Sequence, residues 1–494
     1  MSDNGAQNIH SEEAVGFKPA GRFEVDTLAA EASEKPDGET VRLAGRVMLW
    51  RPMGGIAFGQ LQDRSGRVQF SFDKKALGAD TFKQWTKAIS IGDFIGIEGS
   101  TWTTQKGEKT VAVSSMTVLN KALRPMPDKW QGIHDPDLRY RKRYLDLLSN
   151  EQSRQRFLLR TKVIAFIRRF LDEAGFVEVE TPILQAAASG AAARPFVTHH
   201  NALDRDFYLR ISPETYLKRV VAGGFERVYE LGRNFRNEGI DSSHLQEFTM
   251  LEWYAAYWDY RDNMRFVRKL IQATFDEILG TRSVSFEGIT LDFGGDWPEI
   301  DYRTAVRDAT GIDLREVRDV NALKAAIEDA GLLSEEEADR QVSYAGLVDL
   351  LYKRTVRPGL IQPCFLVHHP VELVPLARRN DDDPTILDMF QVVVNGWEIV
   401  KAYSELVDPI DQRARLEEQV ALREQGDDET MMMEEDFLEC MEHGMPPMSG
   451  LGLGIDRFVA LLTDAPTLRD VVLFPQLREA PGSGPNDDST ESEA

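Results

Sequence analysis

The spacing of apolar and polar residues divides the chain into a strand-rich first part and a longer second part that mixes helices with strands. In the first part, short apolar or alternating segments are separated by turn sequences such as Met53-Gly-Gly and Gln105-Lys-Gly, a pattern typical of β-strands. The predicted strands are residues 41–50, 56–62, 68–73, 94–99 and 110–115, with a helix at residues 82–89. Five strands with a helix after the third predict an OB-type barrel, whose open face takes oligonucleotides; another small antiparallel barrel is the alternative.

The second part opens with a long amphipathic helix, predicted from apolar residues at helical spacing over Ser153–Ala174. Ser153 can cap its start and Gly175 its end. Further strands are predicted at residues 176–182, 228–231, 248–254, 365–369, 389–394, 398–400 and 404–407. Residues 287–360 have a mainly helical and acidic pattern, so we expect an insertion between sheet segments there.

These patterns predict the following domain organisation. We expect a flexible leader at residues 1–38 with room for one short helix, and a proline-containing linker at residues 120–150. The barrel occupies residues 39–119 and the second domain residues 151–478, with the helical insertion at about 287–360. Residues 479–494 are rich in Gly, Ser, Pro and Asp, which is typical of a disordered tail.

Length and composition narrow the class of protein. A chain of 494 residues is too long for one hydrophobic core, and 42% hydrophobic with 28% charged residues is typical of a soluble globular protein. We expect no membrane association, because no apolar run approaches the roughly 18 residues of a membrane span. Cys364 and Cys440 are the only cysteines, which argues against structural zinc and a disulfide framework. The first residues lack a basic start and an apolar core, so we expect no secretory signal and a cytoplasmic location.

The net charge of −23 argues against non-specific binding to nucleic acid. A basic patch nevertheless lies at residues 139–144, while the acidic excess lies at residues 335–339 and 427–436. A local basic patch can bind RNA against an acidic background. Charge alone therefore leaves the partner open.

Charged residues lie inside and between two predicted strands, residues 228–231 and 248–254. If these strands pair antiparallel, one sheet face collects Arg236, Glu238, His244, Phe248 and Glu252. Strand alternation places Glu252 on the same side as Phe248, Met250 and Tyr254. A carboxylate among these side chains is not typical of a solvated surface. The alternative, a plain hairpin with a charged turn, leaves Glu252 unexplained.

A second segment with chemical character is Met448–Leu462, sequence MSGLGLGIDRFVALL. Its glycines at 450, 452 and 454 let a flat ligand approach the backbone, and Arg457 lies in the first turn of the predicted helix. A Rossmann motif and a P-loop are both excluded, because the glycine spacing and a Gly-Lys-Ser/Thr sequence are missing. The pattern favours an adenine site with Arg457 stacking as a planar cation. The alternative is a glycine-rich lead-in to a helix with a surface arginine.

Three segments together resemble the signature motifs of class II aminoacyl-tRNA synthetases: the helix that leads to Pro182, Phe235–Glu238, and Gly450–Arg457. The resemblance is strongest to the lysine–tRNA ligases of that class and extends from Val41 to Pro475. The most specific strings are Leu123–Lys129, Leu138–Leu147, Ala193–Asp204 and Pro375–Asp381. The resemblance implies an α+β fold with an N-terminal OB-fold β-barrel and an antiparallel sheet flanked by helices.

This resemblance also implies a reaction. L-Lysine would be activated with ATP as lysyl-adenylate and transferred to tRNA(Lys), with Mg²⁺ as cofactor, in a homodimer whose interface includes the first motif's helix. Arg236 and Arg457 would be the catalytic residues, since fixed cations stabilise charge on the phosphoryl oxygens. The implied ATP-binding residues are Arg236, Glu238, His244, Phe248, Glu398 and Arg457.

A long substrate with two ammonium groups needs buried carboxylates near both of them. By resemblance, Glu214 and Glu252 surround the α-amino group, Glu405 and Tyr254 meet the ε-ammonium, and Tyr403 packs on the methylenes. The complete implied lysine-binding set is Gly190, Glu214, Arg236, Glu252, Tyr254, Lys401, Tyr403 and Glu405.

The barrel would bind the anticodon. Phe58 can stack on an unpaired base and Gln69 can hydrogen-bond to its edge, and the resemblance adds Glu108 to this set. From the residues alone, an ordinary core position for Phe58 is the stronger alternative.

Three positions depart from the family. Lys401 stands where the family usually has Asn, and Gln391 stands where it usually has a metal-binding Glu, whereas the other metal residue, Glu398, is retained. Because Mg²⁺ is bound through carboxylates and phosphates, one ligand charge is missing. Ser189 replaces the first of two glycines over the α-amino group. We therefore expect weaker or altered activation of lysine.

Other functions stay open at this point. A ligase for aspartate or asparagine would bring an acidic substrate against Glu214, Glu252 and Glu405. A catalytically altered paralogue for RNA binding or amino-acid sensing is supported by Lys401 and Gln391 only. A lysyl-type protein-modifying enzyme would lack the barrel.

Overall fold

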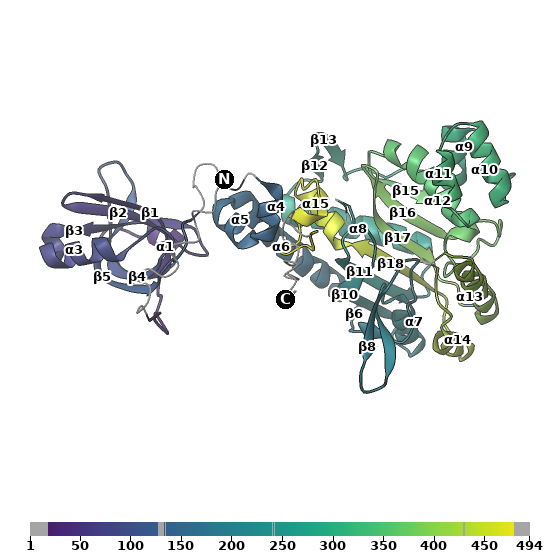
Figure 1. Ribbon diagram of the computed structural model, residues 1–494, viewed down its shortest axis with the longest axis horizontal. Helices are drawn as coiled ribbons and strands as arrows, with labels where there is room; N and C mark the ends of the chain where they lie inside the picture. Colours follow the sequence, from purple (N-terminus) through teal and green to yellow (C-terminus); the bar gives the residue numbers. More distant parts are fainter. Residues whose placement is uncertain are drawn as a thin grey trace, which may run out of the picture. The chain divides into compact units, whose positions relative to one another are not determined.

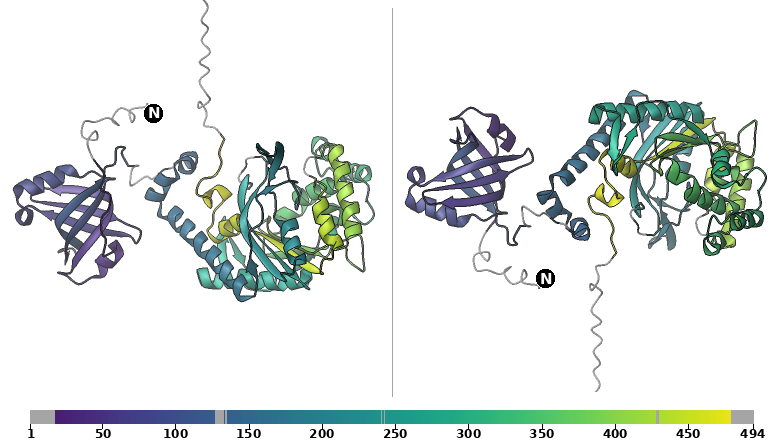
Figure 2. Two further views of the ribbon diagram at one scale, coloured as in Figure 1. Left: turned by 90° about the horizontal axis from the view of Figure 1, so that it is seen from below. Right: turned by 90° about the horizontal axis from the view of Figure 1, so that it is seen from above.

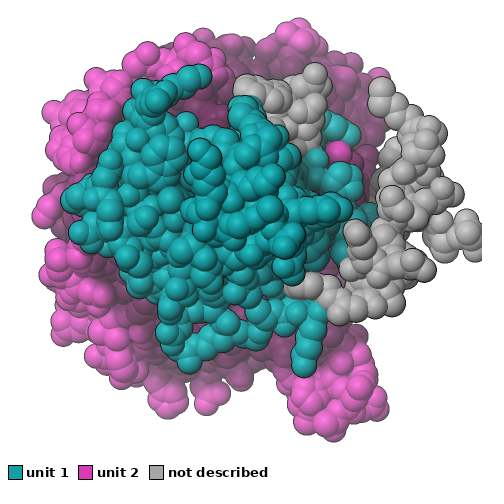
Figure 3. All heavy atoms as spheres, turned by 90° about the vertical axis from the view of Figure 1, so that its left-hand side faces the viewer, with its two compact units in different colours: residues 1–135 teal, residues 136–494 magenta. Residues whose placement is uncertain are grey.

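The computed structural model describes residues 18–126, 133, 135–239, 241, 243–427 and 430–478. The chain forms two compact units, residues 1–135 and residues 136–494, which Figure 3 distinguishes by colour. The predicted disordered tail and most of the predicted leader, up to residue 17, lie outside the described residues. The domain boundaries inferred from the sequence remain predictions.

The first unit is a closed five-stranded barrel, as predicted for an OB-type fold (Figure 1). Its strands follow the order β1-β2-β3-β5-β4, with β3 and β5 parallel and the other pairs antiparallel. The elements are α1 (Ala29–Glu34), β1 (Thr40–Met53), β2 (Ile56–Gln62), β3 (Arg67–Asp73), α2 (Lys74–Leu77), α3 (Ala79–Ala88), β4 (Phe94–Thr103) and β5 (Lys109–Asn120).

Alternation along the strands fills the barrel. In β2, Ala57 and Leu61 are fully buried, while the residues between and beside them are only partly buried, apart from Gly59. The inward residues of all strands meet in one core that includes Val41, Leu43, Val47, Ala57, Leu61, Val68, Phe70, Phe72, Ile95 and Ile97. The period-two pattern that predicted the strands therefore also predicts the core.

The second unit is organised around an eight-stranded sheet of order β14-β15-β16-β17-β18-β11-β10-β6 (Figure 1). Its central strands are antiparallel, and only the outer pairs β14–β15 and β10–β6 are parallel. The strands are β6 (Val177–Glu178), β10 (Arg227–Phe235), β11 (Glu247–Ala256), β14 (Glu299–Asp301), β15 (Cys364–Val367), β16 (Met389–Val394), β17 (Trp397–Ser404) and β18 (Met448–Gly454).

Helices α6 (Glu151–Glu173), α8 (Tyr260–Leu279) and α15 (Ile455–Leu462) pack on the sheet in one continuous core. Helix α6 begins at the Asn150 cap, whose side chain accepts a hydrogen bond from the Ser153 amide. Trp253 of β11 is fully buried in this core beside residues of α8 such as Val267 and Ile271. The core fixes one face of β11 and β18 and leaves the opposite face for a ligand.

Smaller elements complete the unit. They are α4 (Pro136–Arg141), α5 (Arg143–Ser149), β7 (Leu184–Gln185), β8 (Phe196–His200), β9 (Arg205–Leu209), α7 (Glu214–Ala222), β12 (Ser283–Phe286), β13 (Ile289–Asp292), α13 (Pro409–Glu424), α14 (Glu435–Glu442) and the 3₁₀ helices η1 (Arg357–Gly359), η2 (Val371–Leu373) and η3 (Leu468–Asp470). The predicted linker of residues 120–150 thus contains α4 and α5. No helix within the described ranges is both long and apolar enough to cross a membrane.

The predicted helical insertion differs from the structure at its start. Its helices are α9 (Tyr302–Thr310), α10 (Val320–Asp329), α11 (Glu335–Asp339) and α12 (Tyr344–Thr355), and they share their own core with Leu366 and Val393. However, residues 289–301 contain β13 and β14 instead of helix, and β14 joins the main sheet. Figures 1 and 2 show the helices beside this edge of the sheet.

Two strand predictions also change. Residues 398–400 and 404–407 were predicted as separate strands, but β17 runs without a break from Trp397 to Ser404 because it pairs with β16 on one side and β18 on the other. Conversely, only Val177 and Glu178 of residues 176–182 form a strand, since only they find partners in β10. Pairing partners outside the segment decide both cases.

Candidate active site

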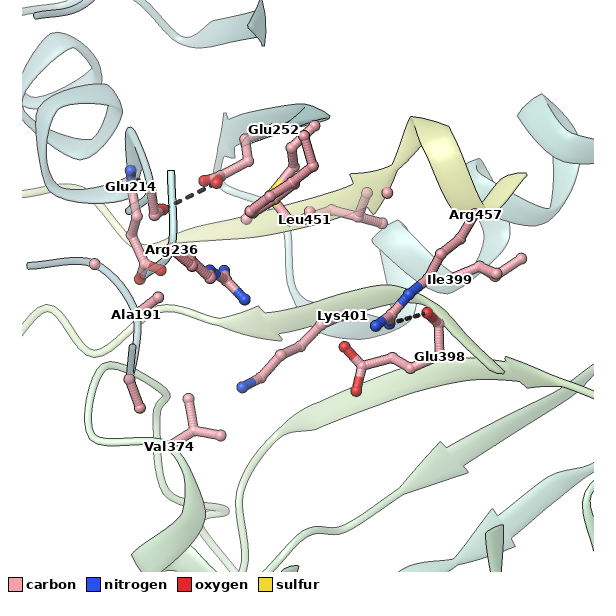
Figure 4. Close-up of a pocket in the computed structure, with 18 of the residues that line it drawn as sticks. Ala191, Glu214, Arg236, Glu252, Val374, Glu398, Ile399, Lys401, Leu451 and Arg457 are labelled. Carbon is pink, nitrogen blue, oxygen red and sulfur yellow. Dashed lines mark hydrogen bonds between the residues drawn. The ribbon is translucent and has the colours of Figure 1, made fainter. Parts of the chain in front are cut away.

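A cavity lies on the free face of the sheet, over β10, β11, β17 and β18 (Figure 4). Its empty volume is about 1320 Å³, including the solvent space at its open mouth. It brings together most of the residues predicted from the sequence: Gly190, Glu214, Arg236, Glu238, His244, Phe248, Glu252, Tyr254, Glu398, Lys401, Tyr403 and Arg457. Glu405 and Gln391 do not line it.

Strand pairing explains the convergence. Glu252 of β11 lies opposite Glu230 of β10 on one side and Gly452 of β18 on the other. On the far side of β18, Gly452 lies opposite Lys401 of β17. Residues distant in sequence therefore occupy one row across the sheet, because side chains of directly paired residues share a face.

One end of the cavity is cationic. The Arg236 guanidinium lies 5.0 Å from the centre of the Phe248 ring, and Arg457 Nη1 donates a hydrogen bond of 2.8 Å to the backbone oxygen of Glu398. Burial lowers the pKa of Arg457, and the nearby Glu398 carboxylate opposes this effect. The two guanidinium groups, one from each predicted motif, both line the cavity, where they can hold phosphate groups.

The glycines of β18 have different roles. A Cβ atom on Gly450 would overlap the Glu405 carboxylate and the Tyr254 ring, whereas on Gly452 its nearest neighbour would be Met250 Sδ at an ordinary 3.6 Å. The space at Gly450 is therefore taken by the protein itself. The opening predicted for a flat ligand is left to Gly452 and Gly454, which line the cavity.

The other end of the cavity is anionic. Glu252 is 4% exposed, and its Oε1 accepts a hydrogen bond of 2.9 Å from Ser212 Oγ. Burial, reinforced by the neighbouring Glu214 carboxylate, raises the pKa of Glu252 to about 8. Without a cation in the cavity, this carboxyl group is mainly protonated at neutral pH.

Glu214 is also buried, but it has partners. The Tyr403 hydroxyl lies 2.7 and 2.8 Å from its two carboxylate oxygens, and Lys218 Nζ lies 2.8 Å from Oε1. Glu214 begins α7, which places Lys218 one turn later on the same face of the helix.

Lys218 also forms an ion pair with Glu405, so Glu214 and Glu405 share one fully buried ammonium group. Burial disfavours this charge, but the two carboxylates prevail and raise the pKa of Lys218 above its ordinary value. For Glu405, burial raises the pKa and Lys218 opposes the rise. Lys218 was not among the residues predicted from the sequence, although its i, i+4 spacing from Glu214 was an available signal.

Lys401 does not neutralise these carboxylates. Its side chain reaches into the cavity, and Figure 4 shows its ammonium group turned away from Glu398. Among the described residues its ammonium forms no ion pair with a carboxylate.

The predicted metal residues form a sparse donor set. Gln391 Nε2 donates a hydrogen bond of 2.5 Å to Glu398 Oε2. Within the described ranges, no group of three or more His, Cys, Asp or Glu side chains is arranged to hold a metal ion. A single carboxylate fits one Mg²⁺ carried by nucleotide phosphates, but it does not fit a second ion.

The loop over the cavity is tied down by Ser189. Its hydroxyl donates to Glu434, which also accepts from Thr215 Oγ1 at 3.3 Å and pairs with Arg219. Next to it, Gly190 has a φ of +83° and lines the cavity. The serine at the position where the family usually has glycine therefore anchors the loop.

The predicted anticodon residues lie on the barrel. Phe58 is half-buried and outside the barrel core, and strand register places it on the same face as Gln69, because Phe58 pairs with Ser71 and Gln60 with Gln69. Gln69 Nε2 donates a hydrogen bond of 2.7 Å to Thr110 Oγ1, and Glu108 is exposed just before β5. The alternative of Phe58 as a core residue is wrong.

Comparison with known proteins agrees with this geometry. The family described as tRNA synthetases class II (D, K and N) matches residues 135–478, and the family described as OB-fold nucleic acid binding domain matches residues 41–119. The fold is thus that of a class II synthetase with an OB-fold domain.

Similarity to individual proteins shows which family within this class the chain belongs to. A protein of Carboxydothermus hydrogenoformans named lysine–tRNA ligase is 44% identical over 468 residues, which cover 94% of this chain and 95% of the relative. Proteins of the same name from Pelotomaculum thermopropionicum and Staphylococcus saprophyticus are each 45% identical, over 94% and 91% of this chain and 92% and 90% of theirs. The chain belongs to the lysine–tRNA ligase family.

The two glycines of β18 lead to a matched pair of substitutions. Gly450→Ala should lower the free energy of unfolding by about 1–3 kcal/mol, because its Cβ overlaps Glu405 and Tyr254. Gly452→Ala meets only ordinary contacts, so its unfolding midpoint in urea should stay close to that of the wild type while ATP binding weakens. Equal destabilisation by both substitutions would contradict the different roles assigned to Gly450 and Gly452.

The raised pKa of Glu252 predicts a pH-dependent stability. The folded protein holds this proton more tightly than the unfolded chain, so the free energy of unfolding falls as pH rises from the ordinary value of 4.5 to about 8. Glu252→Gln removes this loss and should stabilise the protein by about 1 kcal/mol or more at pH 9 relative to pH 5. The measurement is urea unfolding at both pH values. The half-exposed Glu247, on the same strand, is the control site, where Glu247→Gln should show no such difference.

Proposed function

We propose that this chain ligates L-lysine to tRNA(Lys) through a lysyl-adenylate formed from ATP. The observation that carries this proposal is a single cavity with two guanidinium groups at one end and buried carboxylates at the other. ATP presents polyanionic phosphates, and lysine presents two ammonium groups. The relatives whose similarity extends over more than 90% of the chain bear the name of this activity.

At the nucleotide end, Arg236 holds the α-phosphate together with the lysine carboxylate, and Arg457 closes over the adenine or the γ-phosphate. Glu238, His244 and Phe248 place the nucleotide. When the lysine carboxylate attacks the α-phosphorus, negative charge moves onto the phosphoryl oxygens and the pyrophosphate. Arg236 and Arg457 stabilise that charge without transferring a proton. A Mg²⁺ ion carried by the phosphates and held by Glu398 would add further electrostatic stabilisation.

At the lysine end, Glu214, Glu252 and the loop at Gly190 surround the α-ammonium group. Glu405 and Tyr254 serve the ε-ammonium, and Tyr403 packs against the methylenes. Glu405 does not line the cavity but lies directly behind Gly450, where it pairs with Lys218. Its carboxylate therefore adds negative charge close to the lysine end of the cavity, where the second ammonium group of the substrate needs it.

The barrel supplies the nucleic-acid function. Phe58 stacks on an anticodon base, and Gln69 and Glu108 hydrogen-bond to base edges. We further propose a homodimer in the cytoplasm, on the basis of the likeness to the family.

The rival substrates are acidic or neutral amino acids. Aspartate would place a second carboxylate beside Glu214 and Glu252, where like charges repel and burial strengthens the repulsion. Asparagine has no second ammonium group to pair with the remaining buried carboxylate. A binding-only paralogue would not need both Arg236 and Arg457 in the cavity.

Charging of total tRNA with each of the twenty amino acids is the direct test. We expect lysine to be attached, with amino-acid-dependent ATP–pyrophosphate exchange for lysine alone. Charging with aspartate or asparagine, or no exchange with any amino acid, would overturn the proposal.

The proposed role of Glu405 predicts a large effect of its replacement on kcat/KM for lysine. Glu405→Gln removes a carboxylate proposed to serve the ε-ammonium of lysine, and loss of one partner from such a buried ion pair costs about 3–5 kcal/mol. We expect kcat/KM for lysine to fall by several hundredfold or more, measured by pyrophosphate exchange. Glu439→Gln, at an exposed position of α14, should change it less than twofold. A Glu405→Gln enzyme within tenfold of the wild type would show that this carboxylate is not needed.

A further inference from the structure

Lys401 of β17 lines the cavity but has no role in the proposed reaction. Gln391 of β16 lies opposite Lys401 in the antiparallel register and donates a hydrogen bond to Glu398, which also lines the cavity. We propose that Lys401, with Gln391 beside it, is a fixed cation that replaces one divalent ion next to the reacting phosphoryl group. This inference rests on the proposed function and specifies how its charge is balanced.

The combined charge of Gln391 and Lys401 supports this role. A site with glutamate at position 391 and asparagine at position 401 would carry one carboxylate and a neutral amide at these positions. Glutamine at 391 removes one negative charge and lysine at 401 adds one positive charge. Together they change the local charge by the amount that one divalent ion supplies. Because the two residues are register partners, both changes fall at the same place on the sheet.

The side chain of Gln391 is oriented so that its amide nitrogen, and not its oxygen, faces Glu398. Its Nε2 donates to Glu398 Oε2 at 2.5 Å, and an amide nitrogen bearing hydrogens cannot be a metal ligand. Its Oε1 is buried, and Gln391 does not line the cavity. The reverse orientation would place the amide oxygen against a carboxylate oxygen, which is repulsive. One oxygen of Glu398 is thereby taken up by a neighbour inside the protein.

The position of Lys401 in the cavity also supports this role. Its ammonium lies in the cavity and has no carboxylate partner among the described residues, in contrast to the fully paired Lys218. Arg236 and Lys401 both line this cavity, where the α-phosphate and the lysine carboxylate would meet. A cation there attracts an anionic oxygen and repels a second divalent ion.

The test counts metal ions with Mn²⁺, a paramagnetic ion that can take the place of Mg²⁺. Bound Mn²⁺ per active site is measured by electron paramagnetic resonance, with lysine and a non-hydrolysable ATP analogue present. We expect the Gln391→Glu/Lys401→Asn double variant to bind one ion more per site than the wild type. Equal numbers in the two proteins would overturn the inference.

A second measurement does not depend on the double variant. Binding of the ATP analogue is followed by calorimetry in the presence of EDTA. Lys401→Met keeps the length of the side chain and removes its charge, and it should weaken metal-free binding at least tenfold. Lys353→Met, at an exposed helical position paired only with Asp349, is the control and should leave the affinity unchanged. An unchanged affinity for Lys401→Met would also overturn the inference.

Lysine-dependent pyrophosphate exchange, measured on the same wild-type preparation, separates this inference from the proposed function. Exchange with lysine together with equal Mn²⁺ counts rejects only the role of Lys401. Absence of exchange with lysine rejects the proposed function itself.

Discussion

The structure depends on a set of buried charges that is incomplete without a ligand. Glu214, Glu252 and Glu405 lie at one end of the cavity or directly behind it, and Lys218 is the only cation that pairs with any of them among the described residues. With Glu252 ionised, three negative charges meet one positive charge, which leaves two to be balanced. Lysine carries two ammonium groups, so the number of charges in the site matches the substrate.

The sheet makes this arrangement possible. The apolar core beneath β11 and β18 fixes the backbone, and the antiparallel register places Glu252, Gly452 and Lys401 in one row. Gly450 lets Glu405 and Tyr254 approach β18 more closely than any side chain would permit. Without a cation, the cost of burying Glu252 is avoided by protonation, and with a cation the carboxylate can ionise.

Much of this could be predicted from the sequence. Alternation located all five barrel strands, and the carboxylate inside an apolar strand at Glu252 indicated the site before any family was considered. The partner of Glu405 could not be predicted in the same way, because Lys218 and Glu405 are separated by many residues and meet only through tertiary packing. The continuity of β17 and the brevity of β6 likewise depend on partner strands. The close approach at Gly450 depends on the side chains of Tyr254 in β11 and of Glu405, which directly follows β17.

Because the empty site holds a proton on Glu252, lysine binding must displace it if the ammonium group pairs with this carboxylate. Isothermal titration of lysine at pH 7, in buffers that differ in ionisation enthalpy, counts the protons exchanged on binding. The account predicts release of about one proton per lysine bound, because the pKa of Glu252 is about 8 in the empty site and falls when a cation enters. Binding of lysine with no proton release, or with proton uptake, would contradict it.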